Sequence, residues 1–201
     1  MMKIGITGSI ASGKTIASKI LSYKRGPLFS ADKEIKKFYK DNNLKRLLVK
    51  KFNIKKKLNL KNSLKKKILE NKKNIEKLEK IIHPLVRNKM KKFSKLHHKK
   101  DKIFYEIPLL VENKLMKYFD VILFIKAKKK IRLRRFMFKG GSKKLFNTLN
   151  KKQFTDKKKS RYSDHIIKNE KNINILKKKL LGIIKLYEWS IFGYRNNWFI
   201  L

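Results

Sequence analysis

The spacing of apolar residues alternates between short runs typical of buried strands and longer segments with a helical period. It predicts strands over Lys3 to Thr7 and Leu28 to Ser30, separated by a glycine-rich loop and a helix from Gly13 to about Tyr23. From Lys33 to Phe93 no strand pattern occurs, and apolar residues recur at the spacing of amphipathic helices. The first half of the chain therefore reads as two strands followed by a helical insertion.

The second half of the chain repeats the alternation. Strands are predicted over Lys102 to Ile107, over Val121 to Ile125 and, as a last short strand, over His165 to Ile167. Helices are predicted for the segment after Pro108, for Lys128 to Lys139, for residues 143 to 154 behind a Ser142 cap, and for the amphipathic segment from Ile173. Strands that alternate with helices indicate a mostly parallel α/β sheet.

Length and composition favour one globular domain. A chain of 201 residues is long enough for a single α/β core, and 41% of its residues are hydrophobic. The sequence contains no cysteine, which excludes disulfides, thiolate nucleophiles and cysteine-ligated zinc and fits a reducing compartment. The N-terminus lacks a signal-peptide pattern, and apolar runs stay well below the roughly 18 residues of a membrane-spanning helix. We therefore expect a cytoplasmic protein without a membrane span.

The net charge of +43 comes from 57 basic and 14 acidic residues. Such a charge is typical of proteins that bind nucleic acid or anionic membranes when the lysines form one stripe or tail. Here lysines occur in almost every segment, and the joint enrichment of Lys, Ile, Asn and Phe is what AT-biased coding produces. We favour that origin over a nucleic-acid function and expect only nonspecific polyanion binding at low salt.

The segment from Gly8 to Thr15 carries the strongest chemical signal. Its sequence, GSIASGKT, fits the G-x-x-x-x-G-K-[ST] pattern between a predicted strand and a predicted helix. In such a loop, backbone N–H groups surround a phosphate, Lys14 reaches the β- and γ-phosphates, and the Thr15 hydroxyl binds Mg²⁺. The pattern predicts a nucleoside triphosphate site formed by Gly8, Ala11, Ser12, Gly13, Lys14, Thr15 and Ile16.

This loop leaves the acceptor open, because GTPases, helicases, motors and small-molecule kinases share it. A chain of this length has little room beyond a nucleotide core and a substrate lid, which favours a small-molecule kinase. Asp32, at the end of the second predicted strand, is either a base for an attacking hydroxyl or the N-cap of the next helix. Glu106 is either a Walker B type acid that supports Mg²⁺ through water or an exposed strand residue.

Four further segments make the chain resemble the dephospho-CoA kinase family. After GSIASGKT the sequence contains, in order, SADKEI, IIHPLVR, IPLLVEN and a late region in which Gln153, Asp164 and Asn169 keep the family's spacing. The resemblance covers nearly the whole chain to about residue 170. It implies ATP-dependent phosphorylation of the ribose 3′-hydroxyl of dephospho-CoA, the last step of coenzyme A biosynthesis. It also implies a P-loop kinase fold, a parallel sheet flanked by helices with a helical CoA-binding insertion and a lid.

The resemblance assigns roles to individual residues. Asp32 is implied to be the catalytic base, and Asn169 lies where the adenine of ATP is expected. The basic helix with Arg132, Arg134 and Arg135 resembles the closing lid, whose cations contact the transferred phosphate, and Arg135 is our candidate. Substrate contacts are implied in the helical region and beside the acceptor site for Asp32, His83, Pro84, Arg87, Leu109 and Glu112.

Each of these residues also has a purely structural interpretation. Pro84 lacks an N–H donor and predicts a break or kink at His83, which would then be a surface histidine. Glu112 fits the first turn of a helix, where the helix dipole favours acids. The basic lid helix fits a solvated surface. The joint occurrence of the motifs behind the loop favours the functional interpretation.

The sequence departs from the family pattern in the loop and in the lid. Ser9 and Ala11 stand where glycines are more usual, Lys139 replaces a lid arginine, and Gly140 replaces an acid. Because lysine cannot make the planar two-pronged contact of arginine, we expect the lid change to lower turnover or to shift the role to a neighbouring arginine.

We expect a single P-loop kinase domain over residues 1–201. Its core comprises residues 1–32, 102–127 and 162–201, its helical substrate region about 33–95 and its lid about 128–160. The expected ligands are ATP with Mg²⁺ and dephospho-CoA, and the expected state is a monomer. Three alternatives stay open: another small-molecule P-loop kinase, which HPLVR and PLLVEN argue against, a basic nucleic-acid-binding ATPase, and a remnant without activity.

Overall fold

The computed structural model describes residues 1–54, 59–71 and 73–196. The chain forms two compact units, residues 1–29 with 99–201 and residues 30–98. Parts of two predicted regions lie outside the described residues, namely 55–58 and 72 of the helical region and 197–201 of the core. We describe each unit by itself, and the single-domain organisation stays a prediction.

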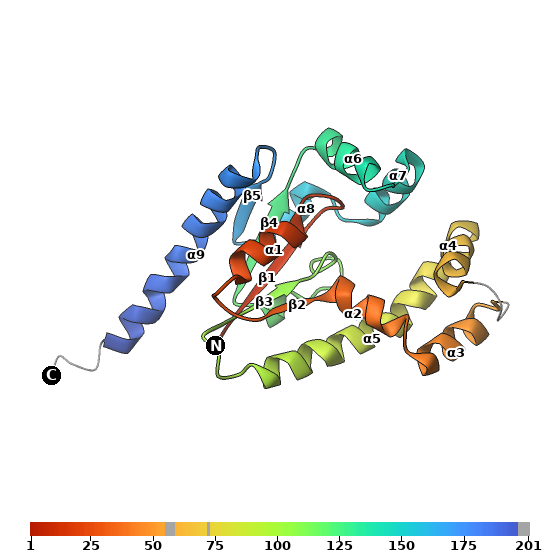
Figure 1. Cartoon of the computed structure of the whole chain (residues 1–201), viewed down its shortest axis with the longest axis horizontal. Coiled ribbons are helices and arrows are strands. Elements are labelled where there is room, and N and C mark those ends of the chain that lie inside the picture. The colour runs from red at the N-terminus through yellow and green to blue at the C-terminus, as the bar shows by residue number, and fades with distance from the viewer. Residues whose placement is uncertain (55–58, 72, 197–201) are drawn as a thin grey trace. The chain divides into compact units, whose positions relative to one another are not determined.

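A five-stranded sheet in the order β2-β3-β1-β4-β5 forms the centre of the first unit (Figure 1). Its strands are β1 (Met2–Gly8), β2 (Leu28–Ser30), β3 (Lys102–Glu106), β4 (Val121–Lys126) and β5 (His165–Lys168). β1 runs parallel to β3 and β4, and β4 runs parallel to β5. From β1 the chain continues to β2 at one end of the sheet, and from the neighbouring strand β4 it continues to β5 at the other end. Parallel sheets bind ligands at the carboxyl edge of such a switch point. The parallel α/β fold predicted from the sequence is confirmed.

Both faces of the sheet are buried at its three central strands, β1, β3 and β4, which explains why these strands read as short, almost continuous apolar runs. One face packs against α1 (Lys14–Ser22) and α9 (Ile173–Asn196), and the core that they share contains Ile4, Ile6, Ala17, Leu21, Leu123, Leu176, Leu180 and Ile184. On the other face, a Cβ added to Gly5 would lie 2.8 Å from Leu110 and 3.0 Å from Phe119. The segment after β3 therefore lies directly on the sheet, and glycine in β1 makes room for it.

The second unit is helical. It contains α2 (Ala31–Phe38), α3 (Asn42–Lys51), α4 (Leu60–Glu70) and α5 (Lys73–Leu96), and both α2 and α4 pack against α5. Its buried apolar side chains recur at helical spacing and include Leu44, Leu48, Leu64, Ile82, Val86 and Met90. Among the described residues between 31 and 98 no strand occurs, as the sequence pattern predicts.

The sequence predicted a break or a kink at His83, and the break is wrong. α5 continues from Lys73 to Leu96 with Pro84 inside it. A proline in a helix interior costs about 3 kcal/mol, because it removes one hydrogen bond and crowds the preceding turn. Ile82, Val86 and Met90 are buried on both sides of the proline, and their packing keeps the helix continuous.

The short helix predicted after Pro108 is also wrong. The segment consists of consecutive turns followed by a 3-10 helix, η1 (Met116–Tyr118). Lys114 adopts a left-handed backbone with φ of 53°, which ends any right-handed helical path at that residue. Glu112 consequently belongs to a turn and not to the first turn of a helix.

Three helices follow β4, namely α6 (Lys129–Phe138), α7 (Lys143–Lys152) and α8 (Asp156–Ser160). The predicted Ser142 cap is confirmed, since its side chain accepts a hydrogen bond from the Leu145 N–H. The sequence pattern did not predict the five-residue α8. No helix within the described part of the chain is long and apolar enough to span a membrane.

Candidate active site

The phosphate-binding loop joins β1 to α1 at the carboxyl edge of the sheet. Gly13 forms the N-cap of α1 with φ of 97°, and a Cβ there would lie 2.2 Å from Nδ2 of Asn169. Both the left-handed backbone and the close amide require glycine at this position. Ala11 has φ of 57°, a left-handed conformation that is unfavourable for a residue with a Cβ.

Lys14 and Thr15 are the first two residues of α1, and both side chains make polar contacts at the loop. Lys14 is only 8% exposed, and its Nζ donates a hydrogen bond to the Ser9 carbonyl at 3.2 Å. The Thr15 hydroxyl donates to Oε1 of Glu106, the last residue of β3, at 2.5 Å. Glu106 is 1% exposed, so its interpretation as an exposed strand residue is wrong. A carboxylate and a hydroxyl in contact form a set of hard oxygen donors suited to a divalent cation.

The loop carbonyl of Ser12 is held by two of the predicted site residues. Asn169, buried directly after β5, donates from Nδ2 to the Ser12 oxygen at 2.8 Å. Arg135 of α6 donates from Nη1 to the Asn169 carbonyl at 3.1 Å and lies 3.5 Å from the Ser12 oxygen. The structure thus brings Arg135 and Asn169 together at the loop, whereas Lys139, at the end of α6, is exposed.

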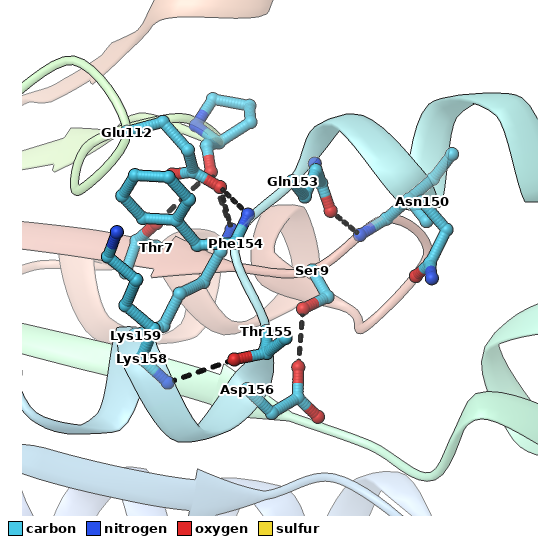
Figure 2. Close-up of polar contacts among 12 residues, drawn as sticks. Thr7, Ser9, Glu112, Asn150, Gln153, Phe154, Thr155, Asp156, Lys158 and Lys159 are labelled. Carbon is cyan, nitrogen blue, oxygen red and sulfur yellow. Dashed lines mark hydrogen bonds and ion pairs between the residues drawn. The ribbon is translucent and has the colours of Figure 1, made fainter.

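The segment between α7 and α8 holds the other half of the loop (Figure 2). Oε1 of Gln153 accepts a hydrogen bond from the Ile10 N–H at 2.8 Å. The Ser9 hydroxyl donates to Oδ1 of Asp156 at 2.7 Å. Thr155 caps α8 by accepting from the Lys158 N–H at 3.2 Å. The residues from Gln153 to Asp156 therefore form a return segment that is tied to the loop by side chains.

A buried ion pair anchors this return segment. Nζ of Lys159 lies 2.8 Å from Oε1 of Glu112, and their side chains are 0% and 9% exposed. The same Glu112 oxygen accepts from the Phe154 N–H at 3.0 Å (Figure 2). Burial lowers the pKa of Lys159, although its hydrogen bond to Glu112 acts in the opposite direction. The other Glu112 oxygen, Oε2, is buried and has no hydrogen-bond partner among the residues that the structure describes.

Four of the predicted substrate residues lie in the helical unit. Ser30 is the N-cap of α2, so the interpretation of Asp32 as a cap is wrong, and Asp32 lies exposed in the first turn of the helix. His83 and Arg87 are four residues apart on α5 and share a face of that helix, while Pro84 is exposed. Burial lowers the pKa of His83, and the nearby Arg87 lowers it further, whereas Glu79 raises it.

The helical unit also contains a pocket of about 470 Å³. Its wall is mainly apolar, and charged and amide side chains stand at intervals around it. The lining residues are Glu34, Lys37, Phe38, Asp41, Asn43, Leu44, Leu47, Leu85 and Lys89. Glu34 and Lys37 form an ion pair at 2.7 Å on one wall.

A family model of dephospho-CoA kinase matches residues 2–174 of the sequence. The chain belongs to the dephospho-CoA kinase family. Kinases of this family phosphorylate dephospho-CoA with ATP during coenzyme A biosynthesis, and the family implies ATP and a divalent metal. The match favours this activity over the other small-molecule kinases and the nucleic-acid-binding ATPase that the sequence pattern left open.

Curated dephospho-CoA kinases resemble the chain over nearly their whole length. The proteins of Bartonella henselae and Rickettsia prowazekii are 33% and 34% identical to it over 190 and 198 residues. The alignments cover 92% and 95% of this chain and 97% and 100% of the relatives. The similarity therefore includes the helical unit and the helices α6 to α8 as well as the phosphate loop.

Solved structures support the same fold. A dephospho-CoA kinase from Campylobacter jejuni has a TM-score of 0.66 at 24% identity, covering 91% of this chain and 95% of its own. The protein TT1252 from Thermus thermophilus has a TM-score of 0.74 at 26% identity, covering 92% and 96%. A shikimate kinase from Bacteroides thetaiotaomicron, at 13% identity, has a TM-score of 0.58 and covers 93% and 98%. The P-loop kinase fold predicted from the sequence is confirmed.

Sequence reasoning missed several residues that shape this dephospho-CoA kinase site. Lys159 lies in a run of three lysines and gave no signal that it would be buried. Arg132 was taken for part of a basic lid face, yet it is buried and donates from Nη1 to Oδ1 of Asn150 at 2.8 Å. Asp156 had one usable signal, because an acid is rare in this lysine-rich chain.

Proposed function

We propose that the chain transfers the γ-phosphate of Mg·ATP to the ribose 3′-hydroxyl of dephospho-CoA, which completes coenzyme A. The observation that carries this proposal is the family match over residues 2–174, joined to a phosphate loop with Lys14, Thr15 and Glu106 at one edge of the sheet. In this proposal the 3′-oxygen attacks the γ-phosphorus, the bond to the bridging oxygen of ADP breaks, and no covalent enzyme intermediate forms.

The phosphate end of the reaction belongs to the loop and α1. Backbone N–H groups from Gly8 to Ile16 and the N-terminus of α1 hold the phosphates of ATP. Lys14 neutralises charge that develops on the transferred phosphoryl group, and Arg135 is our candidate for a second cation. The contacts of Arg135 with Ser12 and Asn169 support this role, because they keep the guanidinium beside the loop.

We infer that the divalent cation is Mg²⁺, with Thr15 as a direct ligand and Glu106 as an acceptor for its water ligands. Mg²⁺ prefers oxygen donors and usually keeps several waters beside one or two protein groups. The contact between the Thr15 hydroxyl and the buried Glu106 carboxylate fits this preference. The bound ion would reduce the charge repulsion between the phosphates and the attacking oxygen.

We assign the acceptor side to Asp32 and to residues of the helical unit. Asp32 accepts the proton of the 3′-hydroxyl, a role supported by its exposed side chain and by the family resemblance. His83, Pro84 and Arg87 contact the CoA moiety, and the lowered pKa of His83 favours a neutral imidazole that forms hydrogen bonds. The largely apolar pocket beside Phe38 and Leu47 takes the pantetheine arm.

We also assign Leu109 and Glu112 to the substrate side and Asn169 to the adenine side of the site. The observed contacts give two of them an additional task, because Glu112 holds the return segment and Asn169 holds the loop. We further propose that the protein is a cytoplasmic monomer and that it binds polyanions nonspecifically at low salt. The net charge of +43 supports the polyanion binding.

A coupled ADP-release assay with Mg·ATP tests this function, with dephospho-CoA compared against adenosine, AMP, shikimate and single-stranded DNA. We expect ADP release with dephospho-CoA only. Lys14→Ala should lower kcat about 10²- to 10³-fold through lost charge stabilisation. Asp32→Asn should lower kcat about 10²- to 10⁴-fold through the lost base.

Lys33→Ala is the matched control for Asp32, since it changes an exposed side chain in the same helical turn. It should retain wild-type kcat. ADP release stimulated by DNA and not by dephospho-CoA would overturn the proposed acceptor. Full activity of Asp32→Asn would overturn the assignment of the base while leaving the acceptor intact.

A further inference from the structure

The peptide groups on both sides of Ile10 are held by side chains from α6 and from the residue after α7. Gln153, which follows α7, accepts from the Ile10 N–H at 2.8 Å. Arg132 of α6 donates from Nη1 to the Ile10 carbonyl at 3.4 Å, and from the same atom to Asn150 of α7 at 2.8 Å. A residue of α6 and the residue after α7 therefore both contact Ile10, in the middle of the phosphate loop.

These contacts fix the direction of the next backbone N–H group, that of Ala11. In a trans peptide the carbonyl and the N–H point to opposite sides. Because Arg132 holds the Ile10 carbonyl toward α6, the Ala11 N–H of the same peptide points away from that helix. N–H groups on the inner side of such a loop are the donors that bind phosphate.

Ala11 itself makes external support necessary. Its φ of 57° lies in the left-handed region, which costs an alanine about 1–2 kcal/mol relative to the right-handed region. Glycine adopts that conformation without this cost. A loop with alanine here needs contacts outside the loop to hold the conformation that glycine would adopt unaided.

The return segment is well placed to supply this support, because it is anchored elsewhere (Figure 2). Asp156 holds the Ser9 hydroxyl at 2.7 Å. The Lys159–Glu112 ion pair and the bond from the Phe154 N–H to Glu112 tie the segment to the turns after β3. Gln153 contacts the loop, and the residues that follow it are tied to the loop and to the turns after β3.

We propose that Gln153 and Arg132 are positioning residues for the nucleotide. They hold the backbone around Ile10 so that Ala11 stays left-handed and its N–H faces the phosphates. The inference deepens the proposed function and rests on ATP binding at this loop. It identifies two side chains that act on the nucleotide through the loop without touching it.

The test removes the acceptor at residue 153 and measures nucleotide affinity directly. Gln153→Ala should weaken Mg·ADP binding about three- to tenfold in calorimetry, the effect of one lost hydrogen bond. The KM for ATP should rise by a similar factor, and the KM for dephospho-CoA should stay unchanged. Lys152→Ala, an exposed neighbour at the end of α7, should bind ADP like the wild type.

A second substitution distinguishes positioning from a general loss of structure. In an Ala11→Gly background, Gln153→Ala should weaken ADP binding less than twofold, because glycine holds the left-handed conformation without help. A merely structural role for Gln153 would give the same loss in both backgrounds. If Gln153→Ala does not fold, Gln153→Leu removes the acceptor and keeps the volume, with the same expectation.

Two results would overturn the inference: unchanged ADP affinity in a folded Gln153 variant, or an equal loss with alanine and glycine at residue 11. Because ADP binding is measured without dephospho-CoA, failure of the positioning role can be distinguished from failure of the proposed function. An enzyme inactive toward dephospho-CoA that still follows the ADP pattern would refute the acceptor and retain the positioning role.

Discussion

The two halves of the phosphate loop are held by different parts of the chain. The half from Ser12 to Thr15 is bound from the sheet, by Asn169 after β5 and by Glu106 at the end of β3. The half with Ser9 and Ile10 is bound by the return segment after α7. The half from Ser12 to Thr15 is thus tied to two core strands as well as to Arg135 of α6, whereas the half with Ser9 and Ile10 has its partners in α6 and in the return segment.

This difference explains why the two halves tolerate different residues. Gly13 has no room for a Cβ, since Asn169 lies against it. At Ser9 and Ala11 side chains occur where the family more usually has glycine, and the return segment contacts that part of the loop. We infer that contacts from outside the loop allow the departure from glycine there.

The largest expected effect comes from a substitution that breaks the buried ion pair of the return segment. Lys159→Met leaves Glu112 buried without its cation, and loss of one partner of a buried ion pair costs about 3–5 kcal/mol. Urea unfolding should therefore show a strongly lowered midpoint. Phosphate-loop residues Ser9 and Ile10 should lose support as well, so ADP affinity of the folded fraction should fall.

Lys157→Met is the control, because it removes an exposed lysine two residues away. Its unfolding midpoint should stay near that of the wild type. A double variant, Glu112→Leu with Lys159→Met, should recover much of the lost stability, because an apolar pair replaces both charges. Equal stability of Lys159→Met and Lys157→Met would show that the ion pair does not anchor the segment.

A smaller effect is expected in the half that the sheet holds. Gly13→Ala adds left-handed strain of about 1–2 kcal/mol and displaces the Asn169 amide, so ADP affinity should fall about tenfold or more. Gly140→Ala supplies a comparison, since Gly140 is left-handed at φ of 78° and no atom of the described part of the chain lies within 4 Å of an added Cβ. Calorimetric titration with Mg·ADP should show a much smaller loss for Gly140→Ala, and equal losses would rule out the Asn169 contact as the cause.

The sequence predicted the half of the loop that the sheet holds better than the other half. The spacing of Gly8, Gly13, Lys14 and Thr15 reflects a local requirement of strand, loop and helix, so pattern alone located it. The partners of Ser9 and Ile10 are more than 140 residues away in sequence. No local period encodes such contacts, and a buried Lys159 looks like its exposed neighbours.

Acidic residues were the underused signal in this chain. With 14 acidic against 57 basic residues, acids are rare in this chain, and several of them make a specific contact. Asp41 caps α3, Asp120 accepts from the Lys3 N–H, and Asp164 accepts from the Ile122 N–H. The failures at Pro84 and after Pro108 have a different cause. At Pro84 the packing of α5 overrode a helix-breaking proline, and after Pro108 the left-handed Lys114 ended a helical pattern.

The smallest expected effect is a pH dependence of the folding stability that comes from Lys159, the anchor of the return segment. Burial lowers the pKa of Lys159 below its ordinary value near 10.5, so the unfolded chain holds this proton more tightly than the folded one. Between the two pKa values the unfolded state binds more protons, and stability from this group must rise with pH. Urea midpoints at pH 7.5 and 9.5 should therefore increase more for the wild type than for Lys159→Met, which lacks the titrating group. Repulsion among the exposed lysines weakens equally in both proteins, so an equal increase would mean that burial does not disfavour the charged form, and the return segment would then have no titrating anchor.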